Sequence, residues 1–214
     1  MFFRNRHDAG KQLVKALEFL RGRSDVIVLA IPRGGVVIGY EIARALDIPL
    51  DVWVARKIGA PMNPELALGA VTGTGVIILE EQIIRSLNVS QYYLDERIRE
   101  YSVEIEKLTK RYRGERPPIT LKDKIVLLVD DGIATGSTVI AGLKAIHKMQ
   151  PAQCILAVPV APEDTVRRLK KEVDQLIVLE VPKTFSALSR FYSRFDQTTD
   201  NEVISLVQEI AVRQ

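Results

Sequence analysis

A loop of small and hydroxyl-bearing residues follows the apolar run Ile125–Val129, where the chain turns toward an expected helix near Thr138. Small residues let backbone N–H groups approach an anion closely, hydroxyls add donors, and the following helix N-terminus adds a positive dipole. The residues that provide these features are Gly132, Ala134, Thr135, Gly136, Ser137 and Thr138. The loop is therefore predicted to bind a phosphomonoester.

Two adjacent carboxylates, Asp130 and Asp131, precede this loop. The Gly-Lys pair of a Walker A loop is absent, which suits a phosphate that is held rather than transferred. Because two carboxylates beside an anion would repel it, they are expected to face sugar hydroxyls or a Mg²⁺ ion. The alternative is an ordinary strand-to-helix turn capped by Asp130. The pattern over residues 125–138 favours the anion site.

A second candidate anion loop, Pro32-Arg33-Gly34-Gly35, follows the apolar run Val26–Ile31. Paired glycines expose backbone donors, and the Arg33 guanidinium can bind two oxygens of a diphosphate at once. Alone, Arg-Gly-Gly is compatible with a plain turn between a strand and a helix. The phosphate loop further along the chain favours an anion site here as well.

The stretch Ala55–Val71 contains two prolines, two glycines and an asparagine. Such residues predict a mobile excursion rather than a packed element. Arg56 and Lys57 stand at the end of the preceding apolar run, and they are expected to face the same crevice as the two loops. The alternative is a solvated strand end.

The elements that must position these loops alternate between strands and helices. Each apolar run is continuous and β-branched, which is typical of a parallel sheet covered on both faces. The expected strands are Val26–Ile31, Asp51–Ala55, Ile125–Val129, Cys154–Val160 and Gln175–Leu179. The expected helices are one through Leu13, Leu17 and Leu20 with Asp8 as its cap, then Val36–Leu46, Thr138–Met149, Pro162–Lys171 and Asp200–Val212. The predicted fold class is α/β, with an open, mainly parallel sheet flanked by helices.

One segment departs from this alternation. Apolar residues spaced by four and three form a seam that predicts one long helix ending before Gly114. The seam consists of Leu94, Ile98, Tyr101, Ile105, Leu108 and Tyr112. Two interpretations remain open, an accessory helix packed on the sheet and a dimerisation helix.

Composition limits the classes of protein that the chain can represent. It has 214 residues, 47% hydrophobic and 27% charged, which fits one globular domain and excludes a disordered chain or a coiled-coil rod. A net charge of +3 is too small to indicate a nucleic-acid binder. The single cysteine, Cys154, favours a cytoplasmic location. No apolar stretch reaches the ~20 residues needed to cross a membrane.

The order Val129-Asp130-Asp131, then Ala134-Thr135-Gly136-Ser137-Thr138, resembles the phosphoribosyl-diphosphate (PRPP) signature of the type I phosphoribosyltransferases. Arg56–Glu65, Tyr112-Arg113-Gly114 and Phe191–Phe195 resemble an uncharacterised subgroup of that family. The resemblance implies a single domain over residues 1–214. Its core covers about 24–80 and 120–181, with a helical insertion at about 81–114. A small hood covers about 182–198 plus the N-terminus.

The implied reaction is displacement of pyrophosphate from C1 of PRPP by a nitrogenous acceptor such as a nucleobase. Mg²⁺ is the implied cofactor, bound mainly through PRPP, with the acidic pair as further candidate ligands. By resemblance, Asp130 and Asp131 bind the ribose hydroxyls, and Ala134, Thr135, Gly136, Ser137 and Thr138 bind the 5′-phosphate. Arg33, Gly34, Gly35, Arg56 and Lys57 bind pyrophosphate, and a non-prolyl cis peptide is expected at Pro32–Arg33. The implied catalytic residues are Arg33, Lys57, Asp130 and Asp131.

The acceptor is expected under the hood, where Phe185, Phe191 and Tyr192 could stack on a planar ring and Glu65 could contact it. The alternatives are that these aromatic rings pack the hood core and that Glu65 is a surface carboxylate. Ala134 stands where relatives that use 6-oxopurines carry aspartate. It argues against hypoxanthine and guanine, and leaves adenine-type, pyrimidine and non-base acceptors open.

The expected partners are PRPP and a small-molecule acceptor, with a homodimer implied by the relatives. The competing hypothesis is a regulator that senses PRPP and binds RNA or DNA. It would use the five basic residues between Lys107 and Arg116. These residues lie at the end of the expected long helix, where cations favour the helix dipole in any case.

Overall fold

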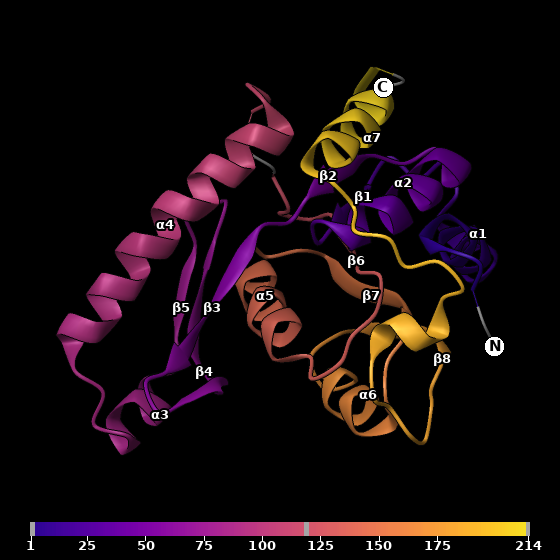
Figure 1. Ribbon diagram of the computed structural model, residues 1–214. Coiled ribbons are helices and arrows are strands. Elements are labelled where there is room, and N and C mark those ends of the chain that lie inside the picture. Colours follow the sequence, from indigo (N-terminus) through magenta and orange to yellow (C-terminus); the bar gives the residue numbers. More distant parts are fainter. Residues whose placement is uncertain (1–2, 118–119, 213–214) are drawn as a thin grey trace.

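The computed structural model describes residues 3–117 and 120–212, so the outermost parts of the predicted domain, 1–2 and 213–214, lie outside the described residues. A five-stranded parallel sheet forms its centre, with strand order β2-β1-β6-β7-β8 (Figure 1). These strands are β1 (Val26–Ala30), β2 (Leu50–Val52), β6 (Ile125–Val129), β7 (Gln153–Val160) and β8 (Gln175–Glu180). The predicted parallel α/β sheet is confirmed, and each expected strand is present to within a few residues.

Helices cover both faces of this sheet, which explains why its strands are apolar throughout. Along β6, Leu127 and Val129 enter one hydrophobic core, while Val126 and Leu128 enter the other. The first core also holds side chains of α1 (Arg6–Ala16), α2 (Gly34–Leu46) and α7 (Asp200–Val212). The second holds those of α5 (Ser137–Lys148) and α6 (Glu163–Leu169). A strand buried on both faces needs no polar alternation.

A second, antiparallel sheet occupies the region predicted to be a mobile excursion, so that prediction is wrong. Its strands are β3 (Ala55–Ala60), β4 (Asn63–Thr72) and β5 (Ile77–Leu79), in the order β3-β4-β5. Its glycines serve close backbone approach. A Cβ at Gly59 would lie 2.5 Å from the Pro64 carbonyl oxygen, and one at Gly69 would lie 2.0 Å from that of Ile78. Glycine here marks tight strand pairing.

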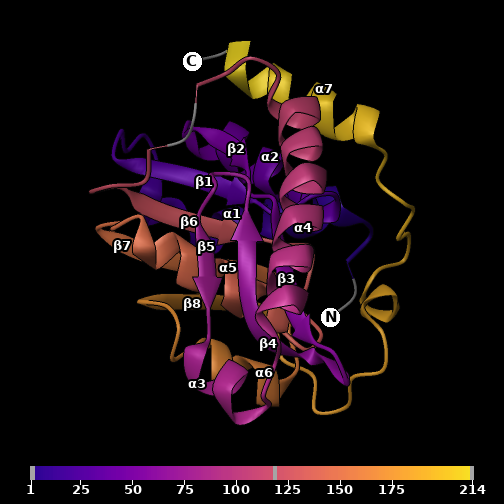
Figure 2. The same cartoon turned by 90° about the vertical axis from the view of Figure 1, so that its left-hand side faces the viewer.

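The long helix predicted from the apolar seam is α4 (Gln91–Arg113), which ends at Gly114 with φ 61°. It follows the short helix α3 (Glu81–Ser86) and packs along the second sheet, whose other side contacts α5 (Figure 2). Leu94, Ile105 and Tyr112 of its seam are buried within this single chain. The interpretation as a helix packed on a sheet therefore accounts for the seam, and the homodimer stays a prediction.

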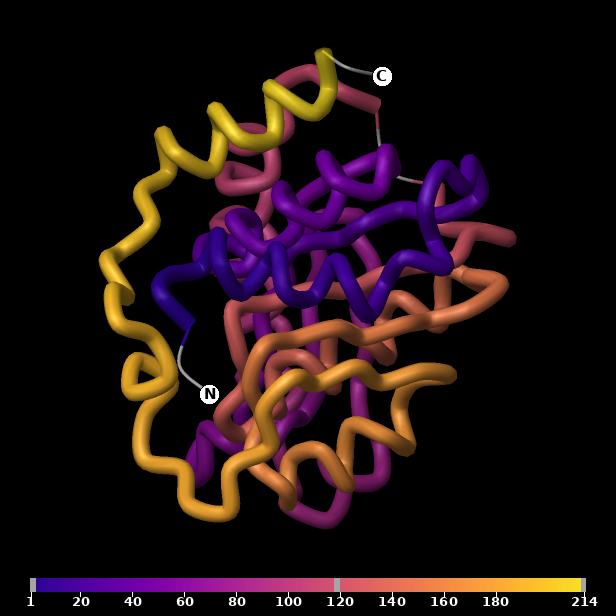
Figure 3. Tube along the Cα trace, turned by 90° about the vertical axis from the view of Figure 1, so that its right-hand side faces the viewer, coloured from indigo at the N-terminus to yellow at the C-terminus, as the bar shows by residue number. Residues whose placement is uncertain are grey.

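The beginning of the chain pairs with the predicted hood, a largely extended segment that contains the short 3-10 helix η2 (Leu188–Phe191). The Phe3 N–H donates to the Phe191 carbonyl at 2.9 Å, and the Ser193 N–H donates to the Phe3 carbonyl at 2.8 Å. Phe3 is fully buried, and its ring lies 5.4 Å from that of Tyr192. Figure 3 shows the two segments side by side. No helix of the described residues is both long and apolar enough to cross a bilayer.

The cap of the first helix differs from the expectation. Asn5, not Asp8, is the N-cap, and its side-chain oxygen accepts a hydrogen bond from the Asp8 N–H at 2.9 Å. Leu13, Leu17 and Leu20 are fully buried as expected, although the helix proper ends at Ala16 and Leu20 belongs to the short 3-10 helix η1 (Glu18–Leu20). The apolar spacing predicted the buried face and not the start of the helix.

Replacing Asn5 with alanine is expected to lower the free energy of unfolding by ~1 kcal/mol, because an N–H of the first turn loses its acceptor. Urea denaturation measures this loss. Lys11→Ala, at an exposed position inside the same helix, is the matched control and should be nearly neutral. Equal stability of the two variants would show that the cap contributes nothing.

Candidate anion-binding site

The two loops singled out by the sequence lie side by side at the carboxyl edge of the sheet. They follow β1 and β6, which are neighbours, and the chain runs from β1 to β2 on one side and from β6 to β7 on the other. Such a reversal of strand order is where open α/β sheets bind ligands. The loops touch. A Cβ at Gly34 would lie 1.9 Å from Asp131 Oδ2, and one at Gly35 would lie 2.9 Å from the Asp130 Cα. Only glycine permits this approach.

The loop after β6 presents free helix donors, as predicted. Gly136 is the N-cap of α5 with φ 73°, a left-handed conformation that favours glycine, and no side chain among the described residues caps the helix. The N–H groups of the first turn therefore remain available for an anion. Two residues of α6 brace the loop from behind, since Thr165 Oγ1 donates to the Ala134 carbonyl at 2.7 Å and Arg168 donates to the Thr135 carbonyl. Sequence reasoning missed both.

The two carboxyl groups of the acidic pair, Asp130 and Asp131, have different electrostatic surroundings. The pKa of Asp130 is raised well above its usual range because burial disfavours its charged form and because Asp131 places a second negative charge beside it. Asp131 has a counter-charge, since Arg6 Nε donates to its Oδ2 at 2.6 Å. Arg6 also donates to the Asp196 carbonyl at 2.6 Å and lies 3.7 Å above the Phe195 ring. Sequence reasoning missed Arg6 as a site residue, because it is 125 positions away from Asp131.

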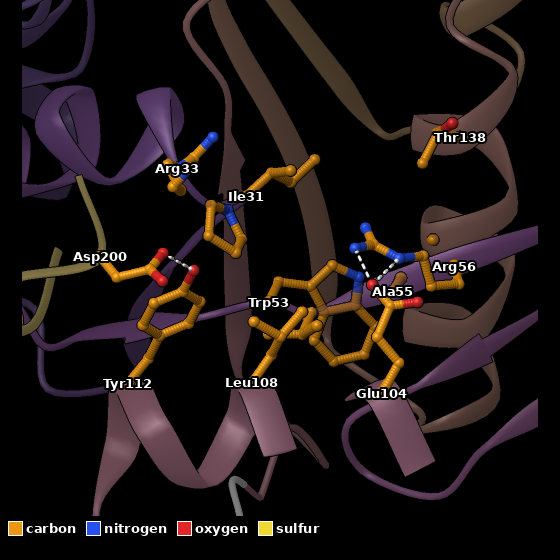
Figure 4. Close-up of a pocket in the computed structure, with 13 residues that line it drawn as sticks. Ile31, Arg33, Trp53, Ala55, Arg56, Glu104, Leu108, Tyr112, Thr138 and Asp200 are labelled. Carbon is orange, nitrogen blue, oxygen red and sulfur yellow. Dashed lines mark hydrogen bonds and ion pairs between the residues drawn. The ribbon is translucent and has the colours of Figure 1, made fainter. Parts of the chain in front are cut away.

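The loop after β1 opens into a cavity of about 530 Å³ (Figure 4). The Pro32–Arg33 peptide is cis, as expected from the family resemblance. Arg33 lines the cavity together with Thr138 of the other loop, so both loops face a common space. The exposed guanidinium of Arg33 has no ion-pair partner among the described residues. The opposite wall belongs to α4, where the pKa of Tyr112 is raised to about 12 by burial and by its hydrogen bond to Asp200.

Arg56 and Lys57 point in opposite directions, because successive side chains of a strand alternate between its faces. Arg56 turns toward α4, pairs with Glu104 and lines the cavity together with Arg33. Lys57 turns toward α5, where its Nζ donates to Ser137 Oγ at 2.9 Å. The two cations therefore leave opposite faces of β3, but both lie at the predicted loops, as expected, because Arg56 lines the cavity that Arg33 and Thr138 share and Lys57 contacts Ser137. Arg56 lies on the side of the predicted pyrophosphate loop, and Lys57 lies at the predicted 5′-phosphate loop.

Glu65 lies over the same loop. Its Oε2 accepts hydrogen bonds from Ser137 Oγ at 3.2 Å and Thr135 Oγ1 at 3.3 Å, and it lies 3.4 Å from Lys57 Nζ. The positive charge of Lys57, with these hydrogen bonds, lowers the pKa of Glu65. The Glu65 side chain is 69% exposed, so Glu65 is a surface carboxylate, which is one of the two roles left open by the sequence. Contact with the acceptor stays a prediction. Together with Asp130 and Asp131, Glu65 is a third carboxylate at the predicted phosphate loop.

The aromatic residues of the hood contact one another. Tyr192 is buried, with its ring 4.9 Å from that of Phe195, and its hydroxyl donates to the Asp131 carbonyl. Phe185 and Phe191 stack with their ring centroids 5.8 Å apart and line a separate hollow beside Arg190. Packing of the hood core therefore describes Tyr192, whereas Phe185 and Phe191 remain half-buried. Whether they contact an acceptor stays a prediction.

Three of the five cations in the basic cluster between Lys107 and Arg116 form ion pairs with aspartates of other elements. Arg113 and Arg116 both pair with Asp51, and Arg111 pairs with Asp200. These cations tie the end of α4 to the central sheet and to α7. The alternative of a nucleic-acid-binding regulator stays a hypothesis.

Comparisons with known proteins agree with this geometry. The phosphoribosyl transferase domain family matches residues 5–194. "Putative phosphoribosyl transferase Rv0571c" of Mycobacterium tuberculosis is 38% identical over 205 residues, 96% of this chain and 46% of that protein. The chain thus spans about half the length of the curated relatives that it matches.

Among solved structures, TT1426 from Thermus thermophilus is 40% identical, with a TM-score of 0.89 over 98% of this chain and 99% of that one. The AQ2163 protein from Aquifex aeolicus, 14% identical with a TM-score of 0.50, covers 82% of this chain and 74% of its own, and shares the fold alone. The family match spans both anion loops and the acidic pair between them. The chain therefore belongs to the phosphoribosyl transferase family.

Proposed function

We propose that the protein is a PRPP-dependent phosphoribosyltransferase, which transfers ribose 5-phosphate to a nitrogenous acceptor and releases pyrophosphate. One observation carries the proposal, namely the direct contact of the two glycine loops across the acidic pair. A sugar held at Asp130 and Asp131 would have one anion loop on each side, at Arg33–Gly35 and at Ala134–Thr138. PRPP carries its diphosphate and its 5′-phosphate on opposite sides of the same ribose.

The chain's own residues would then act by positioning and by charge. Arg33 and the backbone donors of Gly34 and Gly35 would stabilise the negative charge that grows on the leaving diphosphate. The carboxylates of Asp130 and Asp131 would accept hydrogen bonds from the ribose hydroxyls and fix the ring. Lys57, placed at Ser137, would hold the 5′-phosphate. This assigns Lys57 to a different phosphate from the one that the family resemblance implies.

The residues present fit a Mg²⁺ ion only as part of a PRPP complex. The described residues contain no group of three or more His, Cys, Asp or Glu side chains placed to hold a metal. One carboxylate of the acidic pair already has Arg6 as its partner. Mg²⁺ commonly takes one or two carboxylates together with substrate phosphates. We therefore infer that PRPP supplies most of its ligands, with Asp130 and Asp131 beside it. When bound, the ion would neutralise charge on the diphosphate.

The acceptor is proposed to be a nucleobase or a related heterocycle other than hypoxanthine or guanine. Ala134 supports this choice, because it offers no carboxylate to manage a 6-oxopurine proton. We favour the enzyme over the competing PRPP-sensing regulator, because Arg111, Arg113 and Arg116 of the basic cluster already pair with aspartates. We place the protein in the cytoplasm, on the basis of its single cysteine.

PRPP with Mg²⁺ is expected to raise the melting temperature, because a ligand at 100 times its dissociation constant adds about 2.7 kcal/mol to the free energy of unfolding. Thermal unfolding with PRPP, and a screen of heterocycles for pyrophosphate release, test the proposal. Thr135→Val should weaken PRPP binding by about tenfold, since it removes a hydroxyl donor to a charged ligand. Thr120→Val, at an exposed position before the amino end of β6, is the matched control. No stabilisation by PRPP, together with no pyrophosphate release, would refute the proposal.

A further inference from the structure

We propose that Glu65 is an internal ligand of the 5′-phosphate loop, which PRPP must displace and which sets the loop's selectivity for a phosphate dianion. This inference rests on the proposed function, because it concerns the same loop. It assigns Glu65 a role in ligand selection and not in contact with the acceptor.

The carboxylate of Glu65 occupies the donors that the sequence assigns to the phosphate. Thr135 and Ser137 donate their hydroxyls to Glu65 Oε2, and the Lys57 ammonium lies 3.4 Å from the same oxygen. Two hydroxyls and one ammonium converging on one anionic oxygen form the kind of donor set that binds a phosphate oxygen. The donors cannot serve Glu65 and a phosphate fully at the same time.

The contacts of the Glu65 carboxylate are weak enough for a phosphate ligand to replace them. The Glu65 side chain is 69% exposed, and its hydrogen bonds of 3.2 and 3.3 Å are longer than the usual range of about 2.5–3.0 Å for a hydroxyl donor and an oxygen acceptor. An ion pair in contact with solvent contributes little to stability. A phosphate dianion brings two charges and three oxygens to the same donors, and also faces the free N–H groups at the start of α5. Such a ligand can outcompete one carboxylate.

The backbone at Glu65 is held independently of its carboxylate. The Glu65 N–H donates to Asn63 Oδ1 at 3.2 Å, and Lys57 Nζ donates to the Glu65 carbonyl at 3.3 Å. Both contacts join atoms of the β3–β4 hairpin to the backbone of Glu65, and neither uses its carboxylate. Replacing Glu65 therefore removes the competing anion and leaves the hairpin in place.

Selectivity follows from the competition. Every ligand of the loop must first break the contacts of Glu65, but only a group with comparable or greater negative charge forms equivalent contacts afterwards. A ribosyl compound with a free 5′-hydroxyl would therefore be rejected by the carboxylate. Removing the carboxylate should tighten the binding of all phosphate ligands. It should also reduce the difference in affinity between a phosphate ligand and a ribosyl compound with a free 5′-hydroxyl.

Isothermal titration with inorganic phosphate and with PRPP tests the inference. Glu65→Gln and Glu65→Ala are expected to bind both ligands about two- to fivefold more tightly than the wild type, on the scale of one exposed charged contact. A gain of affinity is informative, because structural damage would weaken binding. Glu81→Gln removes a charge from an exposed glutamate that pairs with Arg85, and it should change neither affinity.

The outcomes separate this inference from the proposed function. If the wild type binds PRPP and neither Glu65 variant binds it more tightly, the inference is wrong and the proposed function stands. If the variants gain affinity equally with Glu81→Gln, the effect is one of net charge and the inference is also wrong. If neither the wild type nor the variants bind phosphate or PRPP, the proposed function fails and the inference fails with it.

Discussion

Gly34→Ala should reduce PRPP affinity by at least ~100-fold, which corresponds to about 2.7 kcal/mol of binding free energy. The added methyl group would lie 1.9 Å from Asp131 Oδ2 and 2.7 Å from Arg6 Nε. No rotamer of a methyl group relieves this overlap, so the β1 loop or the acidic pair must move. Either movement separates the groups that are proposed to bind the diphosphate from those that bind the ribose. Calorimetric titration with PRPP measures the loss.

Gly75→Ala is the control for the general effect of adding a methyl group to a glycine. Gly75 has φ +80° and no heavy atom within 4 Å of an added Cβ, so the variant bears only a backbone penalty. Its PRPP affinity should match that of the wild type. Wild-type affinity in Gly34→Ala, with the fold intact by circular dichroism, would show that the contact between the loops is not required.

Asp51→Ala is expected to lower the free energy of unfolding by about 3 kcal/mol, because it leaves a buried guanidinium without its counter-charge. Asp51 lies in β2, where both of its oxygens accept hydrogen bonds from Arg113 Nε, at 3.1 and 3.0 Å. The side chains are only 10% and 9% exposed. The pair fastens the end of α4 to the central sheet. Urea denaturation followed by far-ultraviolet circular dichroism measures the change.

A matched comparison is available in the exposed pair of Asp25 and Arg23, whose side chains are 47% and 45% exposed. Asp25→Ala should leave the free energy of unfolding nearly unchanged, since solvent screens such a pair. If Asp51→Ala destabilises the protein no more than Asp25→Ala does, the attachment of α4 depends on its apolar seam and not on the buried ion pair.

The central sheet could be predicted because each of its strands is marked by consecutive residues of the sequence. Strands such as Ile125–Val129 are apolar throughout, and that pattern requires only that both faces be covered. The two anion loops were predictable for the same reason, since each consists of consecutive small or charged residues at the end of such a strand. Their contact at Gly34 and Asp131 follows from the neighbouring positions of β1 and β6.

The features that sequence reasoning missed depend on distant pairings. The antiparallel sheet was misread because glycine and proline are compatible with a flexible loop as well as with tight strand pairing, as at Gly59 and Gly69. Arg6 reaches Asp131 across 125 positions, and Glu65 reaches Ser137 across 72. No periodicity in one sequence marks such partners. The opposed directions of Arg56 and Lys57 could have been anticipated, had the segment been recognised as a strand.

The pairing of Phe3 with the hood has a practical consequence for anyone preparing the protein. Residues 3 and 4 exchange backbone hydrogen bonds with residues 191–194, and the same short stretch carries the Tyr192 hydroxyl that holds the Asp131 carbonyl. We therefore expect a purification tag joined directly to Phe3 to disturb these hydrogen bonds more than a tag elsewhere. An affinity handle is better attached beyond α7, whose residues make none of these hydrogen bonds.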